Sequence, residues 1–190
     1  MAKEIGRPRN RGIDEAVLRA TVELLGQTPY AELSVEAIAA RAGTSKPAIY
    51  RRWPSKAALV HEAAFPLDST TELVFTGTLL GDIAAMVRRT VAVFSTPAAR
   101  AALPGLVGEM AANPALHTAL LQRFSGILEH GLGDYLAAAV RRGEVRAGVT
   151  AAELAESVAG ITFLALLTRG VPDDAWIDRT AILITKGISA

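Results

Sequence analysis

Cysteine is absent from this sequence of 190 residues, and neither sign of charge is in clear excess. The lack of cysteine excludes a disulfide scaffold, a thiolate zinc site and a cysteine nucleophile. The 20 basic residues are balanced by 19 acidic ones, which leaves a net charge of +1. Taken over the whole chain, that balance gives no indication of a charged partner.

Long apolar runs are also missing. The longest charge-free run, residues 110–122, is interrupted by Asn113, Pro114 and His117. It falls short of the about 18 apolar residues that a membrane span needs. The N-terminal sequence MAKEIGRPRNRG lacks the apolar stretch of a signal peptide. We therefore expect a cytoplasmic protein with no membrane partner.

What the chain does contain is typical of a folded, helical protein. Hydrophobic residues make up 51% and charged residues 21%, a composition that can offset the entropy lost on ordering. The length suits one domain or two small ones. Alanine, the best helix former, occurs 36 times, and alternating β-branched runs are few. We predict an all-α fold.

Four short helices are expected in residues 13–65. Ile13, Val17, Ala20 and Leu24 recur on one face of a first helix that ends near Gly26. Good N-cap residues precede the next three helices, which are expected after Ser34, Ser45 and Ser55. Gly43 should end the second helix, Pro54 the third and Pro66 the fourth.

Five more helices are expected in the remaining chain. Apolar periodicity predicts a helix over residues 77–95, and Pro97, Pro104 and Gly105 predict a short or broken one after it. A long helix should run from Pro114 to just before Gly143. Two further helices should cover residues 154–169 and 177–188, which brings the expected total to about nine.

The balanced charge conceals an asymmetry along the chain. Residues 1–56 hold ten basic and six acidic groups, a net charge of +4. Residues 57–190 hold ten basic and thirteen acidic groups, a net charge of −3. A basic first third on a slightly acidic body indicates that one end of the protein meets a polyanion.

Residues 34–53, SVEAIAARAGTSKPAIYRRW, have the pattern of a helix-turn-helix: a short helix, a turn with Gly43, and a second helix. Ile49 and Trp53 can anchor the second helix inward, while Lys46 and Tyr50 share another face. Arg51, Arg52 and Lys56 flank it as groups that can meet phosphates. The alternative, an ordinary solvated helix end, explains the cations but not the agreement of caps, turn and anchors.

The segment LSVEAIAARAGTSKPAIYRRWPSKAALV resembles the DNA-binding signature of the TetR family of bacterial transcriptional regulators. The resemblance covers residues 13–65, including the Ser45-Lys46-Pro47 helix start, where Ser45 is a further candidate DNA contact. Beyond residue 66 it reduces to the number and order of helices. It implies DNA-base positions at Lys46, Pro47, Ala48 and Tyr50, and DNA-backbone contacts from Ser34, Arg51, Arg52 and Lys56. Glu36 departs from relatives that carry a basic, base-reading residue there.

The N-terminal Gly6-Arg7-Pro8-Arg9 supports two interpretations. Arg7 and Arg9 could lie in the narrow minor groove of A·T-rich DNA, where negative potential is enhanced. The alternative is a solubilising tail. We predict a flexible basic arm over residues 1–12, a helix-turn-helix domain over 13–65, and a ligand-binding and dimerisation domain over 66–190.

Two features of residues 66–190 point to a sensor and a dimer. Bulky side chains that could line a small-molecule pocket are Met86, Phe94, Met110, His117, Phe124 and Tyr135, although such residues are more often plain core. The last two helices are rich in apolar residues, including ITFLALL at 161–167. Candidate dimer residues there are Ala155, Val158, Ile161, Leu164, Ile177 and Ile184.

The resemblance implies a four-helix dimer interface, an effector pocket in the body, and two recognition helices on a palindromic operator of double-stranded DNA. The expected mechanism is ligand-controlled repression by a homodimer. An architectural helix-turn-helix protein without an effector is the main alternative. We expect no enzyme, no metal and no cofactor, because the three histidines lack ligand spacing and phosphate-binding glycine loops are absent.

Overall fold

The computed structural model describes residues 11–66, 75–122 and 131–190. Within these ranges the chain is all-α, as predicted, with a single isolated antiparallel bridge between Val145 and Ser189. The described helices are α1 (Arg11–Leu25), α2 (Val35–Arg41), α3 (Lys46–Tyr50), α4 (Lys56–Ala64), α6 (Leu79–Phe94), α7 (Pro97–Ala112), α8 (Pro114–Gln122), α9 (Gly133–Arg141), α10 (Ala151–Arg169) and α11 (Asp174–Ile188).

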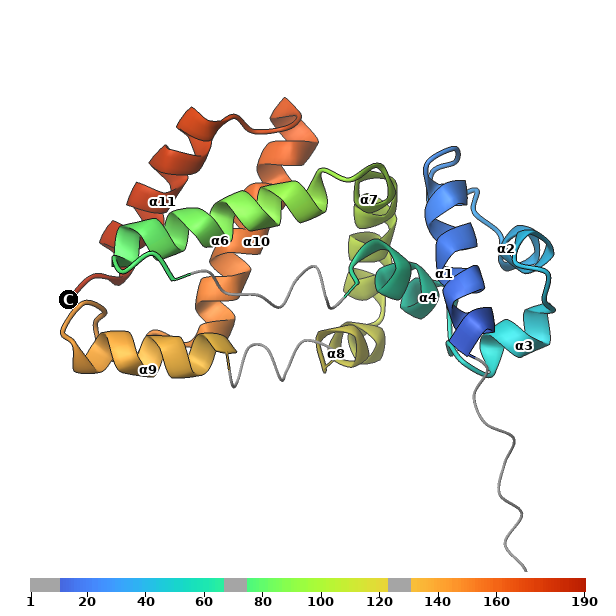
Figure 1. The fold of residues 1–190 in the computed structure, drawn as a ribbon, viewed down its shortest axis with the longest axis horizontal. Helices are drawn as coiled ribbons and strands as arrows, with labels where there is room; N and C mark the ends of the chain where they lie inside the picture. Colours follow the sequence, from blue (N-terminus) through green and yellow to red (C-terminus); the bar gives the residue numbers. More distant parts are fainter. Residues whose placement is uncertain (1–10, 67–74, 123–130) are drawn as a thin grey trace, which may run out of the picture.

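The molecule is elongated, with α1, α2 and α3 at one end and α6, α9, α10 and α11 at the other (Figure 1). We call residues 11–66 the head and residues 75–190 the body. Serine caps begin the head helices as predicted: Ser34, Ser45 and Ser55 each accept a hydrogen bond from the backbone N–H three residues later. Gly43 follows α2 with a φ of 65°, a left-handed conformation that favours glycine.

The head core continues into α7. Buried side chains of α1 to α4 form one apolar cluster with Ala98, Ala99, Ala102 and Leu106 of α7. Val17, Ile38, Ile49 and Leu59 are at its centre, almost fully buried. A movement of α7 therefore acts directly on the packing of the head.

A second core holds the far end of the body together. Ile83 and Val87 of α6 pack with apolar side chains of α9, α10 and α11. Helix α6 lies against both α10 and α11, and its last turn leads into α7. The body thus connects its distal helices to the head through α6 and α7.

The prediction that Pro97, Pro104 and Gly105 would shorten or break the next helix is wrong, since α7 continues for 16 residues. Pro97 lies in the first turn, where its missing N–H is not needed. Pro104 removes one backbone hydrogen bond inside the helix, because proline has no N–H. At the neighbouring turn the Ala101 carbonyl accepts the Tyr30 N–H at 3.3 Å, so another segment of the chain is bonded there.

Two further boundaries differ from the predictions. The long helix expected from Pro114 to Gly143 is recorded as α8 and α9, which run in different directions, and residues 123–130 lie outside the described ranges. Glycines at 131 and 133 disfavour helix at the start of α9. Helix α3 ends at Tyr50 rather than at Pro54, because Arg52 N–H and Trp53 N–H both bond to the Ile49 carbonyl. The described ranges therefore hold ten helices instead of nine.

Candidate nucleic-acid interface

Helix α3 divides its side chains between the head core and solvent. Ile49 and Trp53 are buried, as their spacing predicts. Lys46, Pro47 and Tyr50 are exposed, and Tyr50 keeps 41% of its surface accessible. An α-helix that presents donors and a flat ring on one face has the form needed to read base edges in a major groove.

Ala48 and Ser45, two other predicted DNA residues, have different surroundings. Ala48 is buried, with 8% of its surface exposed. Ser45 is exposed, but its hydroxyl oxygen accepts the Ala48 N–H at 3.4 Å as the helix cap. Ser34 is exposed and caps α2 in the same way.

Glu36 and Lys46 join α2 to α3 across the exposed face of the head. The Lys46 ammonium forms an ion pair with the Glu36 carboxylate and lies 5.9 Å from the centre of the Tyr50 ring. Their hydrogen bond raises the pKa of Lys46 and lowers the pKa of Glu36. We call Glu36, Lys46 and Tyr50 the reading trio. It presents a carboxylate, an ammonium and an aromatic ring side by side on the exposed face of the head.

Several other cations of the head are bound to acids or carbonyls of the head itself. Arg52 pairs with Asp14 of α1, and its guanidinium also donates to the Ala48 carbonyl at 3.1 Å. Arg41 pairs with Glu23 at 2.7 Å. Arg51 is exposed. These ion pairs join residues 10 to 38 positions apart, so helical spacing could not have predicted them.

Lys56 holds the segment between α1 and α2. Its ammonium donates to the Tyr30 carbonyl at 3.0 Å and to the Leu33 carbonyl at 3.3 Å, and lies 4.2 Å from the centre of the Tyr30 ring. The predicted phosphate contact from Lys56 stays a prediction. In this structure the ammonium is held half-buried at the start of α4.

Tyr30 in turn joins the head to α7. Its hydroxyl donates to Glu109 Oε1 at 2.7 Å, and its N–H bonds to Ala101. Its ring fills the space above Gly105: a β-carbon there would lie 2.6 Å from Tyr30 Cγ. Burial, followed by the hydrogen bond to Glu109, raises the pKa of Tyr30 well above its usual value, so the phenol stays protonated. The sequence did not predict this contact between the head and α7, because Tyr30 and Glu109 are 79 residues apart.

The residues predicted for a pocket are dispersed. Met86 packs against the second core, at the far end of the body. Phe94 packs edge-on against Phe65 beside the head core. His117 is exposed. Met110 is half-buried on α7. Phe124 lies outside the described residues, as do Arg7 and Arg9. Tyr135 is buried and lines a cavity of about 440 Å³ at the start of α6.

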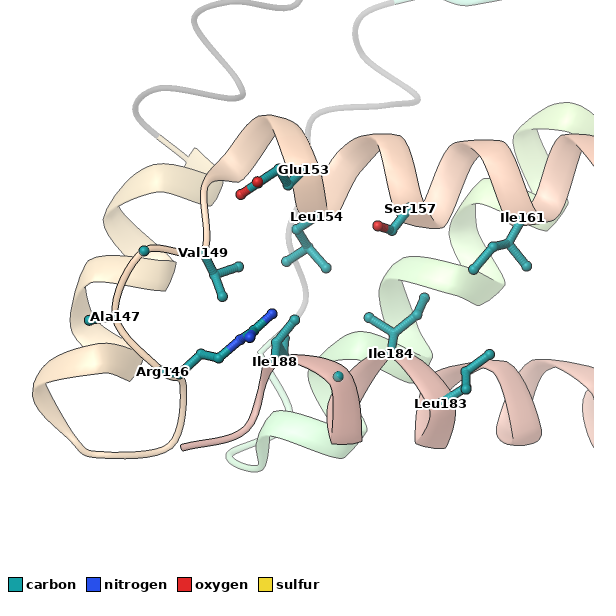
Figure 2. Close-up of a pocket in the computed structure, with 12 residues that line it drawn as sticks. Arg146, Ala147, Val149, Glu153, Leu154, Ser157, Ile161, Leu183, Ile184 and Ile188 are labelled. Carbon is teal, nitrogen blue, oxygen red and sulfur yellow. The ribbon is translucent and has the colours of Figure 1, made fainter.

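The predicted dimer residues of α10 and α11 fall on two faces. Val158, Ile177 and Ile184 are buried, and Leu164 is exposed. Ile161 and Ile184 line a second cavity, of about 580 Å³, between the two helices (Figure 2). Figure 2 shows Leu154 and Ile161 of α10 facing Ile184 and Ile188 of α11 across that space.

Helix α10 also meets the length and composition of a membrane span, with a mean hydropathy of 1.4 over 18 residues. Only 22% of that window is buried within the protein. The sequence of this helix is not a charge-free run, because Glu153 and Glu156 interrupt it. In the described part of the chain, no three histidine, aspartate or glutamate side chains gather in a group that could hold a metal ion.

Comparison with known proteins identifies both parts of the chain. A family model described as "Bacterial regulatory proteins, tetR family" matches residues 17–63. A second, described as "Tetracyclin repressor-like, C-terminal domain", matches residues 75–184. Together they cover the helix-turn-helix and most of the body.

Individual relatives agree over nearly full length. The chain is 32% identical to the "DNA-binding transcriptional repressor TetR" of Mycobacteroides abscessus, over 86% of this chain and 87% of that protein. It is 27% identical to YdeS of Bacillus subtilis, an uncharacterised HTH-type transcriptional regulator, over 100% of this chain and 96% of YdeS.

A solved structure gives the same result. The crystal structure of the TetR family transcription regulator SCO0332 matches with a TM-score of 0.69 and 29% identity, over 94% of this chain and 99% of that one. Such proteins regulate transcription and are not enzymes. The chain belongs to the TetR family of bacterial transcriptional regulators and carries a helix-turn-helix DNA-binding domain.

Proposed function

We propose that this regulator is a cytoplasmic repressor that binds a palindromic operator as a homodimer and releases it when a small-molecule effector binds. The observation that carries the proposal is the presence of two exposed surfaces at opposite ends of the molecule. One is the reading trio on α2 and α3; the other is the apolar surface of α10 and α11 (Figure 1). The relative from Mycobacteroides abscessus, named a repressor, supports repression over activation.

The apolar surface of α10 and α11 supports dimerisation. Leu164, Leu167, Ile182 and Leu183 leave between 41% and 65% of their surfaces exposed. Several large apolar side chains exposed on two helices are typical of an interaction surface. A second copy of the same surface would cover them around a two-fold axis, as most homodimers do. Two-fold symmetry then requires two reading trios on an operator with inverted repeats.

The connection of α7 to the head supports release by an effector. A ligand in the body that shifts α6 and α7 would move Tyr30, and with it the segment that Lys56 holds. The two heads would then no longer match successive major grooves. A coupling of about 1–3 kcal/mol would change operator occupancy about 5- to 150-fold.

Selection of bound DNA from a random library, with and without candidate effectors, tests the proposal. We expect an inverted repeat whose half-site centres lie about one helical turn apart, roughly 34–36 Å. Binding to the selected operator should weaken with salt at a log–log slope of about −5 to −7 per dimer, if each head neutralises three or four phosphates.

Light scattering without detergent should give twice the mass of one chain. A single unrepeated half-site, a monomer at working concentration or a slope near zero would contradict the proposal. Sequence-independent binding that ignores every ligand would instead favour an architectural role.

A further inference from the structure

The cavity of about 440 Å³ lies where the segment before α6 meets α9, at the far end of the body from the head. Its lining includes Phe75 and Thr78 before α6, Asp82 in the first turn of α6, and Tyr135 of α9. Its volume falls within the range of small-molecule sites. The cavity also brings together a buried carboxylate and two aromatic rings.

Asp82 is a carboxylate that is only 4% exposed and has no cation paired with it among the described residues. Among the described residues, three hydrogen bonds reach Asp82, and all come from neutral donors. The Tyr135 hydroxyl donates to Oδ2 at 3.0 Å, and the Thr76 N–H and hydroxyl donate to Oδ1 at 2.5 and 2.9 Å. A buried charge held only by neutral donors gains from a cation that can reach it.

Arg142 interacts with Asp82 only through space and forms its ion pair with the other charged group of the lining, Glu144. The Arg142 guanidinium is committed to Glu144, through hydrogen bonds of 2.9 and 2.7 Å to its two carboxylate oxygens. Arg142 and Glu144 both line the cavity. In the described part of the lining, two carboxylates and one guanidinium give a net charge of −1.

The rings supply an apolar wall. Phe75 stacks on Tyr135, with ring centres 5.3 Å apart and planes 25° apart. Phe75 leaves 60% of its surface exposed, so its ring can be reached from solvent. Burial, followed by the hydrogen bond to Asp82, raises the pKa of Tyr135 above its usual value, so its phenol is neutral. Aromatic faces beside a carboxylate attract organic cations through both charge and π electrons.

We propose that this cavity binds an organic ammonium ion, with Asp82 as its counter-ion and the Phe75 and Tyr135 rings as its wall, and that such an ion is the effector. The assignment of this ion as the effector rests on the proposed function. Helix α6 begins at this cavity, packs along α10 and α11, and contacts α7, which shares the head core. An ion that tightens the first turn of α6 therefore acts on the element that leads to the head.

Calorimetry on the full chain without DNA tests the site. The probes are tetramethylammonium, phenethylammonium and benzyltrimethylammonium, with phenylacetate as the anionic counterpart. We expect saturable binding of at least one ammonium probe and none of phenylacetate. Equal binding of the anion, or no binding of any ammonium probe up to about 10 mM, would overturn the proposal.

Two variants and a control locate the site. Asp82→Asn keeps the shape of the side chain and removes its charge, so ammonium affinity should fall about 10-fold or more. Glu156→Gln removes an exposed carboxylate from α10 and should leave the ammonium affinity unchanged. Unchanged affinity in Asp82→Asn would refute the site. If that variant does not fold, Phe75→Leu decides: loss of the ring at an exposed position should weaken the ammonium probe, and equal affinity would refute the site.

A second arm separates this proposal from the proposed function. The bound probe is added to the complex with the selected operator. Binding with release of DNA supports both halves, whereas binding without release refutes the effector role and leaves the ammonium site. Failure to bind refutes the site, while the operator and dimer stay testable by DNA selection.

Discussion

Replacement of Gly105 by alanine should push the head away from α7, because the added methyl group would enter the space that the Tyr30 ring occupies. The new β-carbon would lie 2.6 Å from Tyr30 Cγ and 2.9 Å from Tyr30 Cβ. These atoms are at the root of the side chain and cannot swing aside. The hydroxyl is held by Glu109 and the backbone by Ala101 and Lys56, so the ring has no free direction in which to yield.

The magnitude follows from two opposing contributions. Overpacking of this kind costs about 1–3 kcal/mol. Alanine in place of glycine inside a helix returns about 0.5–1 kcal/mol. Gly108, three residues further along α7, provides a matched control, since a β-carbon there would meet nothing within 4 Å. Gly108→Ala should therefore show the gain alone.

Thermal unfolding at equal protein concentration measures the difference between the two variants. For a chain of this length, 1 kcal/mol shifts Tm by about 2–4 °C, so Gly105→Ala should melt about 2–12 °C below Gly108→Ala. Operator affinity should fall about fivefold or more in Gly105→Ala and stay unchanged in Gly108→Ala. Adding Tyr30→Leu should shrink the penalty of Gly105→Ala, because the obstructing ring is gone. Equal gains in Tm for both glycine variants would refute the reasoning.

Three further changes test other surfaces. Tyr50→Ala should abolish operator binding in a gel-shift assay while light scattering still reports a dimer; normal binding would refute the placement of α3 on DNA. Glu36→Gln frees Lys46 for a phosphate, so affinity for random-sequence DNA should rise and the salt slope from fluorescence anisotropy should steepen by about one per head; an unchanged slope would contradict the pairing. Leu183→Glu places a charge in the dimer surface and should halve the mass in light scattering, and a persistent dimer would move the interface elsewhere.

The fold of the head could be predicted from local sequence features. Serine caps, the turn at Gly43 and the four-residue spacing of Ile49 and Trp53 are short-range features, and the structure has each where the sequence predicts it. The body was less predictable for the same reason. Pro104 reads locally as a helix breaker, but packing against Tyr30 holds α7 together across it. Tertiary contacts between distant residues outweighed the local preference.

The candidate sites divide along the same line. Of the α3 residues that the family signature places toward DNA bases, Lys46, Pro47 and Tyr50 are exposed and Ala48 is buried. The sequence did not predict that Glu36, Asp14 and Glu23 pair with cations of the head. Those pairs depend on how α1, α2 and α3 cross. The cavity residue Asp82 escaped notice because a single acidic residue in a first helical turn is ordinary. Only the fold brings it to Tyr135, 53 residues away.

The shared core of the head and α7 has a consequence for evolution and engineering. The two family models part between residues 63 and 75, yet the buried apolar contacts of the head extend to Leu106. The stretch that is recognisable as an inherited module is therefore shorter than the stretch that folds as a cooperative unit. A chimera spliced near residue 66 would inherit a foreign α7 beneath its Tyr30. Regulators recombined from two parents should keep their switching only when the graft brings along the α7 face around Ala102, Gly105 and Leu106.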